Sequence, residues 1–157
     1  MPATAAHPEH LWFLDTLIRV RIGHTDGPDG ISVLEHRAPY KDSPPLHVHK
    51  TEDEIFHILD GKVRLRIEGV ERICGPGDTA LATKGTPHTY RIESANGARW
   101  LTITVRGDFE RFVRAMGRPA ARLELPPSSG APTPEAQAAL ASSASQFGIE
   151  IVGPPLH

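Results

Sequence analysis

The sequence predicts an all-β fold, a small barrel or sandwich of short strands. Hydrophobic and polar residues alternate over short stretches, most clearly in Lys62–Glu68, where Val63, Leu65 and Ile67 share one face. Turns rich in Gly and Pro separate these stretches at short intervals, which is typical of sandwiches and barrels. No helical pattern lies between them, so parallel βαβ units are disfavoured.

The expected strands follow one another up to about Val105. Besides 62–68, they are Leu17–Ile22, Ile31–Arg37, Leu46–His49, Glu54–Leu59, Val70–Ile73, Thr79–Ala82, His88–Ile92 and Arg99–Val105. A chain of 157 residues fits one domain, and we find no internal repeat. We therefore expect a flexible N-terminus over residues 1–10 and one barrel over 11–106.

Residues 107–157 are predicted to form helices and a linker that pack on the barrel. Asp108 is the expected N-cap of a first helix, whose apolar stripe from Phe109 to Met116 would face the barrel. After a Pro/Ser-rich linker, Thr133 and Pro134 begin a second helix that runs to about Gln146. Ile149–Val152 is expected to add a short edge strand.

Composition excludes several classes of protein. The net charge is -2 and no basic block is present, which argues against a nucleic-acid partner. The apolar run Leu11–Leu14 is too short for a membrane span or a signal segment, so we expect no membrane partner. Cys74 is the single cysteine, so no intrachain disulfide forms, and we expect a reducing, cytoplasmic location. We interpret this thiol as an inert residue at a strand end.

The chemically informative segment contains His47-x-His49, followed by Glu54. Residues two apart in a strand share a face and lie about 6.6 Å apart, so both imidazoles can converge on one ion. A turn over residues 50–53 is expected to bring the next strand back beside the first, with the Glu54 carboxylate near the imidazoles. Glu54 is preferred to Glu52 and Asp53 because it begins an apolar strand, whereas acidic residues in a turn are usually solvated.

His88 is the third imidazole candidate. It begins a strand directly after Pro87, which restricts the backbone. Three imidazoles and a carboxylate facing an apolar interior would be costly without a cation. The other histidines receive the ordinary interpretation: His24, His36 and His57 as partly buried strand residues without a function, and His7, His10 and His157 as solvated residues near the termini.

These residues match the motifs of a known family. The segment His47-x-His49-x4-Glu54-x6-Gly61 resembles the first cupin motif, and Gly77-x5-Thr83-x-Gly85-x2-His88 resembles the second. Thr83 stands where proline is usual, and Ile92 where asparagine is common. The resemblance covers about residues 30–105 by motif, and the N-terminal strands and helical tail also resemble those of small single-domain cupins related to quercetin dioxygenase. It implies a cupin (jelly-roll) β-barrel with a short C-terminal helical extension, and a homodimer.

The resemblance also implies that His47, His49, Glu54 and His88 hold one divalent transition-metal ion. Three nitrogens and one oxygen suit Fe, Mn, Ni, Zn or Cu and leave coordination positions open. We expect walls that are mostly apolar and contact a small-molecule substrate. They comprise Val33, Phe56, Ile58 and Tyr90, with Trp100 or Ile103 as further candidates.

The leading hypothesis is a dioxygenase that uses O2 on a flavonol-like or other small aromatic or enolic substrate, with Glu54 also acting as general base. Two alternatives stay open. One is a non-catalytic cupin that binds or senses a small molecule. The other is a non-redox isomerase or cyclase that uses the metal as a Lewis acid.

Overall fold

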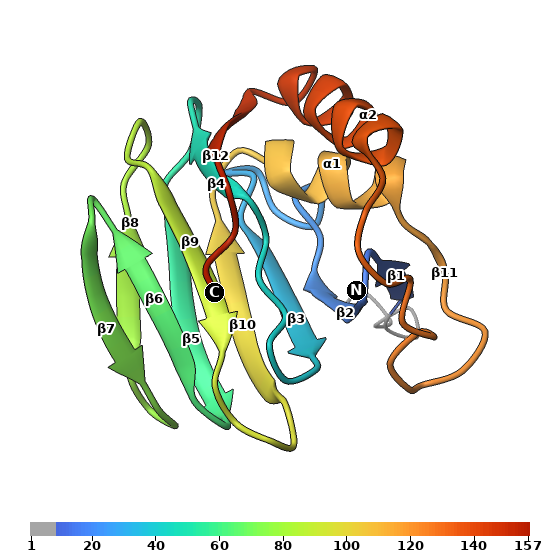
Figure 1. Cartoon of the computed structure of the whole chain (residues 1–157). Coiled ribbons are helices and arrows are strands. Elements are labelled where there is room, and N and C mark those ends of the chain that lie inside the picture. The colour runs from blue at the N-terminus through green and yellow to red at the C-terminus, as the bar shows by residue number, and fades with distance from the viewer. Residues whose placement is uncertain (1–8) are drawn as a thin grey trace.

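Two antiparallel β-sheets face each other in the computed structural model, which describes residues 9–157 (Figure 1). The N-terminal segment expected to be flexible lies, up to residue 8, outside the described residues. The sheets are formed by the short alternating stretches that the sequence indicates, so the predicted all-β jelly-roll fold is confirmed.

The larger sheet has seven strands in the order β11-β1-β2-β3-β10-β5-β8. Their bounds are β1 His10–Phe13, β2 Thr16–Ile22, β3 Ser32–Ala38, β5 Glu54–Asp60, β8 Thr79–Ala82, β10 Ala98–Thr104 and β11 Arg118–Pro119. The smaller sheet has five strands in the order β12-β4-β9-β6-β7. Their bounds are β4 Leu46–His49, β6 Val63–Ile67, β7 Val70–Cys74, β9 His88–Ile92 and β12 Ile149–Gly153.

Two strands were not among those expected from the sequence. β1 carries the apolar run that begins at Leu11, and it pairs with β2 in a hairpin whose turn has Leu14 at φ 52. β11 is only two residues long and pairs with β1. Both lack the repeated alternation that identifies the longer strands. The predicted edge strand near the C-terminus is confirmed as β12, which pairs with β4.

Helices α1 (Asp108–Met116) and α2 (Pro134–Ser145) lie together at one end of the two sheets (Figure 1). Thr133 caps α2 as predicted, since its side chain accepts a hydrogen bond from the backbone N–H of Ala136. The prediction for Asp108 was wrong: Gly107 is the N-cap of α1, in the left-handed region at φ 80, and Asp108 is the first helical residue. No helix within residues 9–157 is long and apolar enough to cross a membrane.

The core consists of two apolar clusters. One lies under the helices and joins β1, β2 and β3 to Phe109, Phe112 and Val113 of α1, so that most of the helix stripe packs on the sheets as expected. The other lies between the two sheets and includes Phe56 and Trp100. The candidate ligands contact both clusters, because His49 packs on Phe109 and His88 packs on Phe56.

Candidate metal site

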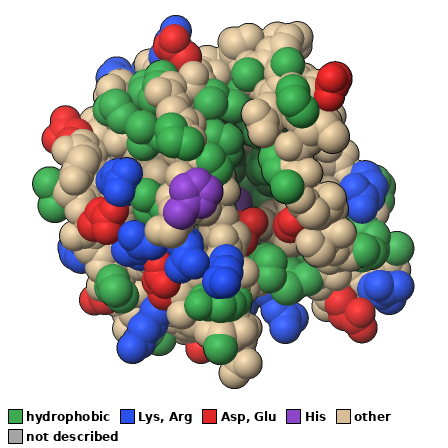
Figure 2. Space-filling view, viewed as in Figure 1, with side chains coloured by type: hydrophobic (Ala, Val, Ile, Leu, Met, Phe, Trp, Pro, Cys, Tyr) green, Lys and Arg blue, Asp and Glu red, His purple; other side chains and the backbone are tan. Residues whose placement is uncertain are grey.

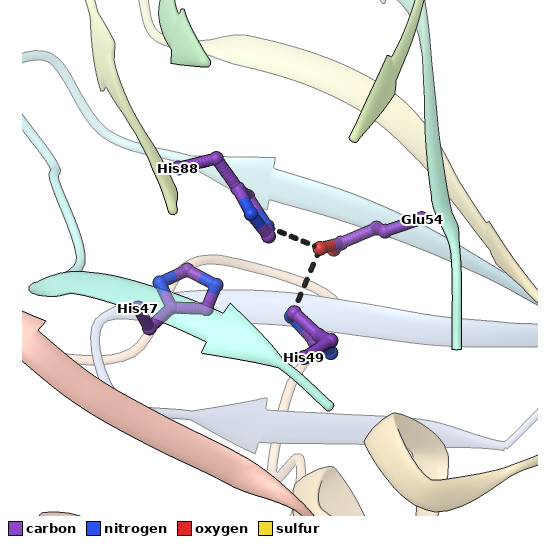
Figure 3. A group of neighbouring side chains, drawn as sticks. All are labelled: His47, His49, Glu54 and His88. Carbon is purple, nitrogen blue, oxygen red and sulfur yellow. Dashed lines mark hydrogen bonds and ion pairs between the residues drawn. The ribbon is translucent and has the colours of Figure 1, made fainter. Parts of the chain in front are cut away.

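Four potential ligands converge in the interior. The ligand atoms of His47, His49, Glu54 and His88 all lie within 4.8 Å of one another. In Figure 3, His49 and His88 point at the Glu54 carboxylate, with His47 beside them. His49, Glu54 and His88 are buried, whereas His47 is half-buried, so the site is most open on the side of His47.

Strand register explains how three of these side chains meet. His47 and His49 lie two apart on β4 and share a face, and His88 of β9 stands directly opposite His47. The three rings are neighbours: the His47 and His88 centroids lie 4.5 Å apart, and those of His49 and His88 lie 5.2 Å apart. One sheet therefore provides all three imidazoles.

Glu54 lies on a strand of the other sheet, not on a neighbour of β4 as expected. The sequence predicted that its strand would run beside the strand of His47 and His49. Instead, β4 pairs with β9 and β12, while β5 belongs to the other sheet and pairs with β8 and β10. The connection at residues 50–53 crosses between the sheets, and the carboxylate reaches over the interior. A local turn argument cannot distinguish a hairpin from a crossing of this kind.

Backbone acceptors orient two of the imidazoles. The Nδ1 atom of His47 lies 2.8 Å from the Pro45 carbonyl, and the Nδ1 atom of His88 lies 2.9 Å from the Thr86 carbonyl. An Nδ1–H that donates to a carbonyl leaves Nε2 free as a lone-pair ligand, which is the usual tautomer at metal centres. The geometry therefore prepares both rings to coordinate through Nε2.

The loop before His88 is closed by residues of the second motif. Thr83 stands where proline is usual, and its hydroxyl lies 2.8 Å from that of Thr86. Gly85, with φ +82, donates its N–H to the carbonyl of His49 at 2.8 Å. These bonds fix the loop that carries His88 against the strand that carries His49.

The carboxylate is charged and closely paired. Burial alone would raise the pKa of Glu54, but the charge of His49 and the hydrogen bonds from His49 and His88 hold the pKa well below its usual range. Its Oε2 atom lies 3.0 Å from His49 Nε2 and 2.8 Å from His88 Nε2. Burial opposes protonation of His88, yet the hydrogen bond and charge of Glu54 raise its pKa. Burial, reinforced by His88 and His49, lowers the pKa of His47 to about 3.

The donor set fits a divalent transition-metal ion. Three imidazoles and one carboxylate enclose a single position, and within residues 9–157 the Nε2 atom of buried His49 has only the poorly aligned Glu54 carboxylate as a polar partner. A buried polar group without a good hydrogen bond costs about 1–3 kcal/mol, a cost that a bound cation offsets. Imidazole with carboxylate suits Fe, Mn, Ni, Zn or Cu rather than Mg or Ca.

The two acidic neighbours of Glu54 are not alike. Asp53 is exposed, as expected, and accepts the N–H of Lys84. Glu52 was expected to be solvated, and this prediction was wrong, because its side chain is only 1 % exposed. Its carboxylate accepts the N–H of Phe109 at 2.6 Å and the N–H of Arg106 at 3.1 Å. Glu52 thus caps the start of α1, where the helix dipole favours an anion.

This cap connects the ligands to the helix. The Phe109 ring packs edge-on against His49 with a centroid distance of 5.5 Å. Thr51, in the same connection, donates to Asp108 at 2.6 Å. Residues 50–53 therefore hold the start of α1 against a candidate ligand, a role that no local pattern in the acidic run indicates.

Four of the six expected wall residues lie in or at the edge of the interior. Phe56, Ile58 and Trp100 are buried between the sheets, and half-buried Tyr90 packs against that cluster. Tyr90 lies 5.0 Å from Trp100 and 6.3 Å from Phe56 between ring centroids. Burial, with the charges of Asp42 and Glu54, holds the pKa of Tyr90 well above its usual value, so its hydroxyl stays a neutral donor. Figure 2 shows a hollow in the middle of one face, bordered mostly by hydrophobic side chains.

Val33 and Ile103 do not line the interior. They pair directly across β3 and β10, and both are half-buried on the outer face, whereas their neighbours Leu34 and Thr102 are buried. The alternation contains the signal that was missed: the face of Val33 also carries Glu35 and Arg37. Charged residues mark that face as outer, and an apolar residue alone does not mark an inner one.

Two polar residues without a role predicted from the sequence are removed from water, one fully and one in part. His36 is 4 % exposed and stacks between Trp100 and Phe109, at centroid distances of 5.0 and 5.9 Å. Burial lowers its pKa to about 4, although Glu54 acts in the opposite direction, so the ring is neutral. Asp42, in the loop before β4, is half-buried, and burial together with Asp15 raises its pKa to about 7.

Comparison with known proteins agrees with this architecture. The model of the cupin domain family matches residues 33–104. The chain is similar to quercetin 2,3-dioxygenase of Bacillus subtilis, with 37% identity over 86 residues. That stretch is 55% of this chain but only 25% of the relative, so this chain spans about a quarter of that protein.

Solved structures show the same fold at low sequence identity. A predicted oxalate decarboxylase from Thermotoga maritima superposes with a TM-score of 0.57 and 17% identity, covering 66% of this chain and 95% of that chain. The cupin domain of Cnp3 from Schizosaccharomyces pombe has a TM-score of 0.54 and 13% identity, covering 73% and 78% of the two chains. At this identity the likeness concerns the fold alone.

Proposed function

We propose that this chain, whose residues 33–104 match the cupin domain family and which is similar over part of its length to quercetin 2,3-dioxygenase, is a metal-dependent dioxygenase acting on a small aromatic or enolic, flavonol-like substrate. The observation that carries the proposal is the convergence of His47, His49, Glu54 and His88 within 4.8 Å. A divalent ion held there would supply Lewis-acid and redox chemistry to a chelating substrate oxygen and O2.

The residues around the site would act as a base, as an apolar wall and as a hydrogen-bond donor. Glu54 is the candidate general base, because its buried carboxylate is ionised and faces the position that a substrate would share with the ion. Phe56 and Trp100 form an apolar, aromatic wall that would exclude water and pack against a planar substrate. Tyr90 offers the one wall hydroxyl, which would donate a hydrogen bond to a substrate oxygen.

Oxygen consumption tests the proposal. Protein loaded separately with Fe, Mn, Ni or Cu would be mixed with flavonols, β-diketones or catechols in an oxygen-electrode cell. We expect uptake with at least one combination, and its loss in His49→Ala. His57→Ala is the matched control, because His57 lies on the opposite face of β5 from Glu54 and forms a hydrogen bond with Thr79 on the surface. No uptake with any combination would refute the proposal.

Two other outcomes would assign the site differently. Tight substrate binding without turnover under any metal would indicate a binding or sensing cupin. Turnover retained with Zn under anaerobic conditions would indicate a non-redox isomerase or cyclase. We also propose that the chain forms a homodimer. Light scattering coupled to size exclusion would test this, and a monomer at micromolar concentration would contradict it.

A further inference from the structure

A cleft on the outer face of the larger sheet gathers an excess of positive charge, and it is separate from the metal site. Its volume is about 140 Å³. We call it the arginine cleft; it is lined by His10, Leu17, Arg19, Glu35, Arg37, Arg99 and Leu123. The arginines alternate along β2, β3 and β10 with buried Ile18, His36 and Trp100, so the cleft lies outside the sheets and the ligands lie between them.

Strand register brings the guanidinium groups together. Arg37 of β3 stands directly opposite Arg99 of β10 on one side and Leu17 of β2 on the other. Arg19 stands opposite His10 and Glu35. Like charges directly opposite each other in antiparallel strands destabilise the pair. A sequence that keeps Arg37 and Arg99 in this register therefore carries an electrostatic cost that the fold itself does not require.

The acidic side chains in the lining of the arginine cleft do not balance its arginines. Glu35 is the one carboxylate in the lining, and it already contacts Arg21 at 2.7 Å and Arg99 at 3.4 Å. Arg19 and Arg37 form no ion pair among residues 9–157. The Nε atom of Arg19 is buried and has no hydrogen-bond partner within that range. Within residues 9–157, neither Arg19 nor Arg37 thus has a carboxylate partner, and the Nε atom of Arg19 is removed from water.

The walls restrict the ligand further. Leu17 is buried, and Leu123, from the segment after β11, is 65% exposed. The volume of the cleft suits a single small group rather than an extended chain. A guanidinium fork matches the two oxygens of a carboxylate. We propose that the arginine cleft binds a carboxylate carried on a small apolar group, with Arg19 and Arg37 holding the oxygens and the two leucines contacting the apolar part.

Benzoate is a suitable probe, and benzamide is its neutral counterpart. Binding would be followed by NMR or calorimetry in a low-salt buffer, on metal-free protein, because a carboxylate also coordinates metals. We expect saturable benzoate binding that is weakened tenfold or more in Arg37→Gln and in Arg19→Gln, since each removes a charge-assisted hydrogen bond. Arg66→Gln is the control, because Arg66 is half-buried like Arg19 but lies on β6 of the other sheet and pairs with Glu71.

Stability gives an independent readout in the same variants. Without ligand, Arg37→Gln is expected to melt at the same temperature as the parent protein or higher, because it relieves the repulsion from Arg99. Benzoate should raise the melting temperature of the parent and of Arg66→Gln, but not that of Arg37→Gln. Equal benzoate affinity in parent and Arg37→Gln, or benzamide binding as tightly as benzoate, would overturn the proposal. Inorganic phosphate binding as tightly as benzoate would overturn its apolar part.

Discussion

Replacing Glu52 by alanine would remove the anion that caps helix α1. Its carboxylate accepts two backbone N–H groups, at 2.6 and 3.1 Å, from a position that is 1 % exposed. A hydrogen bond to a charged group contributes about 1.5–3 kcal/mol, and the N–H of Phe109 would be left buried without a partner. We therefore expect the substitution to lower the free energy of unfolding by about 3–5 kcal/mol. For a domain of this size that corresponds to a fall in melting temperature of roughly 10 °C.

Calorimetry or circular dichroism would measure the loss. Asp53→Ala is the matched control, because this adjacent carboxylate is exposed and accepts only the N–H of Lys84; we expect it to cost less than about 1 kcal/mol. Since the cap holds Phe109 against His49, Glu52→Ala should also weaken metal binding in samples that remain folded. Equal melting temperatures for Glu52→Ala and Asp53→Ala would refute the reasoning.

Three further predictions concern ionisation and the ligands. The pKa of Asp42 is about 7 in the folded protein, against an ordinary value of 3.8, so its contribution to stability falls as pH rises between these values. Asp42→Asn should therefore stabilise the protein by up to about 4 kcal/mol more at pH 8 than at pH 4. Urea unfolding at the two pH values would measure this difference. A gain that is independent of pH would contradict this. Histidine ligates only when neutral, so metal should dissociate as pH falls below about 6.5, and equal metal content after dialysis at pH 7 and pH 4.5 would argue against ligation by three imidazoles. His36→Phe removes two buried nitrogens that have no hydrogen-bond partner among residues 9–157, and it keeps the stacking on Trp100 and Phe109. We therefore expect an unchanged or higher melting temperature, and a fall of several degrees would show that His36 has a polar partner.

The sequence predicts best where the pattern is local and repeated. The bounds of β4, β8 and β9 agree with the expected strands residue for residue, because alternation and Gly/Pro turns define them. Three of the four candidate ligands are also local in origin: His47 and His49 share a face by parity, and His88 follows a fixed Gly/Pro loop. Glu54 was selected correctly from its apolar strand, but the sheet to which that strand belongs could not be predicted from the local turn.

What the sequence could not predict depends on contacts between distant segments. Glu52 and Phe109 are 57 residues apart, and nothing in the acidic run distinguishes a helix cap from a solvated turn. β5 joins the opposite sheet from β4 because of its pairing with β10, which begins nearly 40 residues after β5 ends. Val33 and Ile103 were assigned to the interior by their apolar character, although the charged residues that share their face indicate the outside.

Metal content measures the central claim most directly. Elemental analysis would be carried out on protein purified without an affinity tag, alongside His49→Ala and His57→Ala prepared in the same way. Convergence of three imidazoles and Glu54 predicts about one transition-metal ion per chain in the parent protein and in His57→Ala, and nearly none in folded His49→Ala. Equal metal content in His49→Ala and the parent, or no metal in the parent even after loading, would contradict the account.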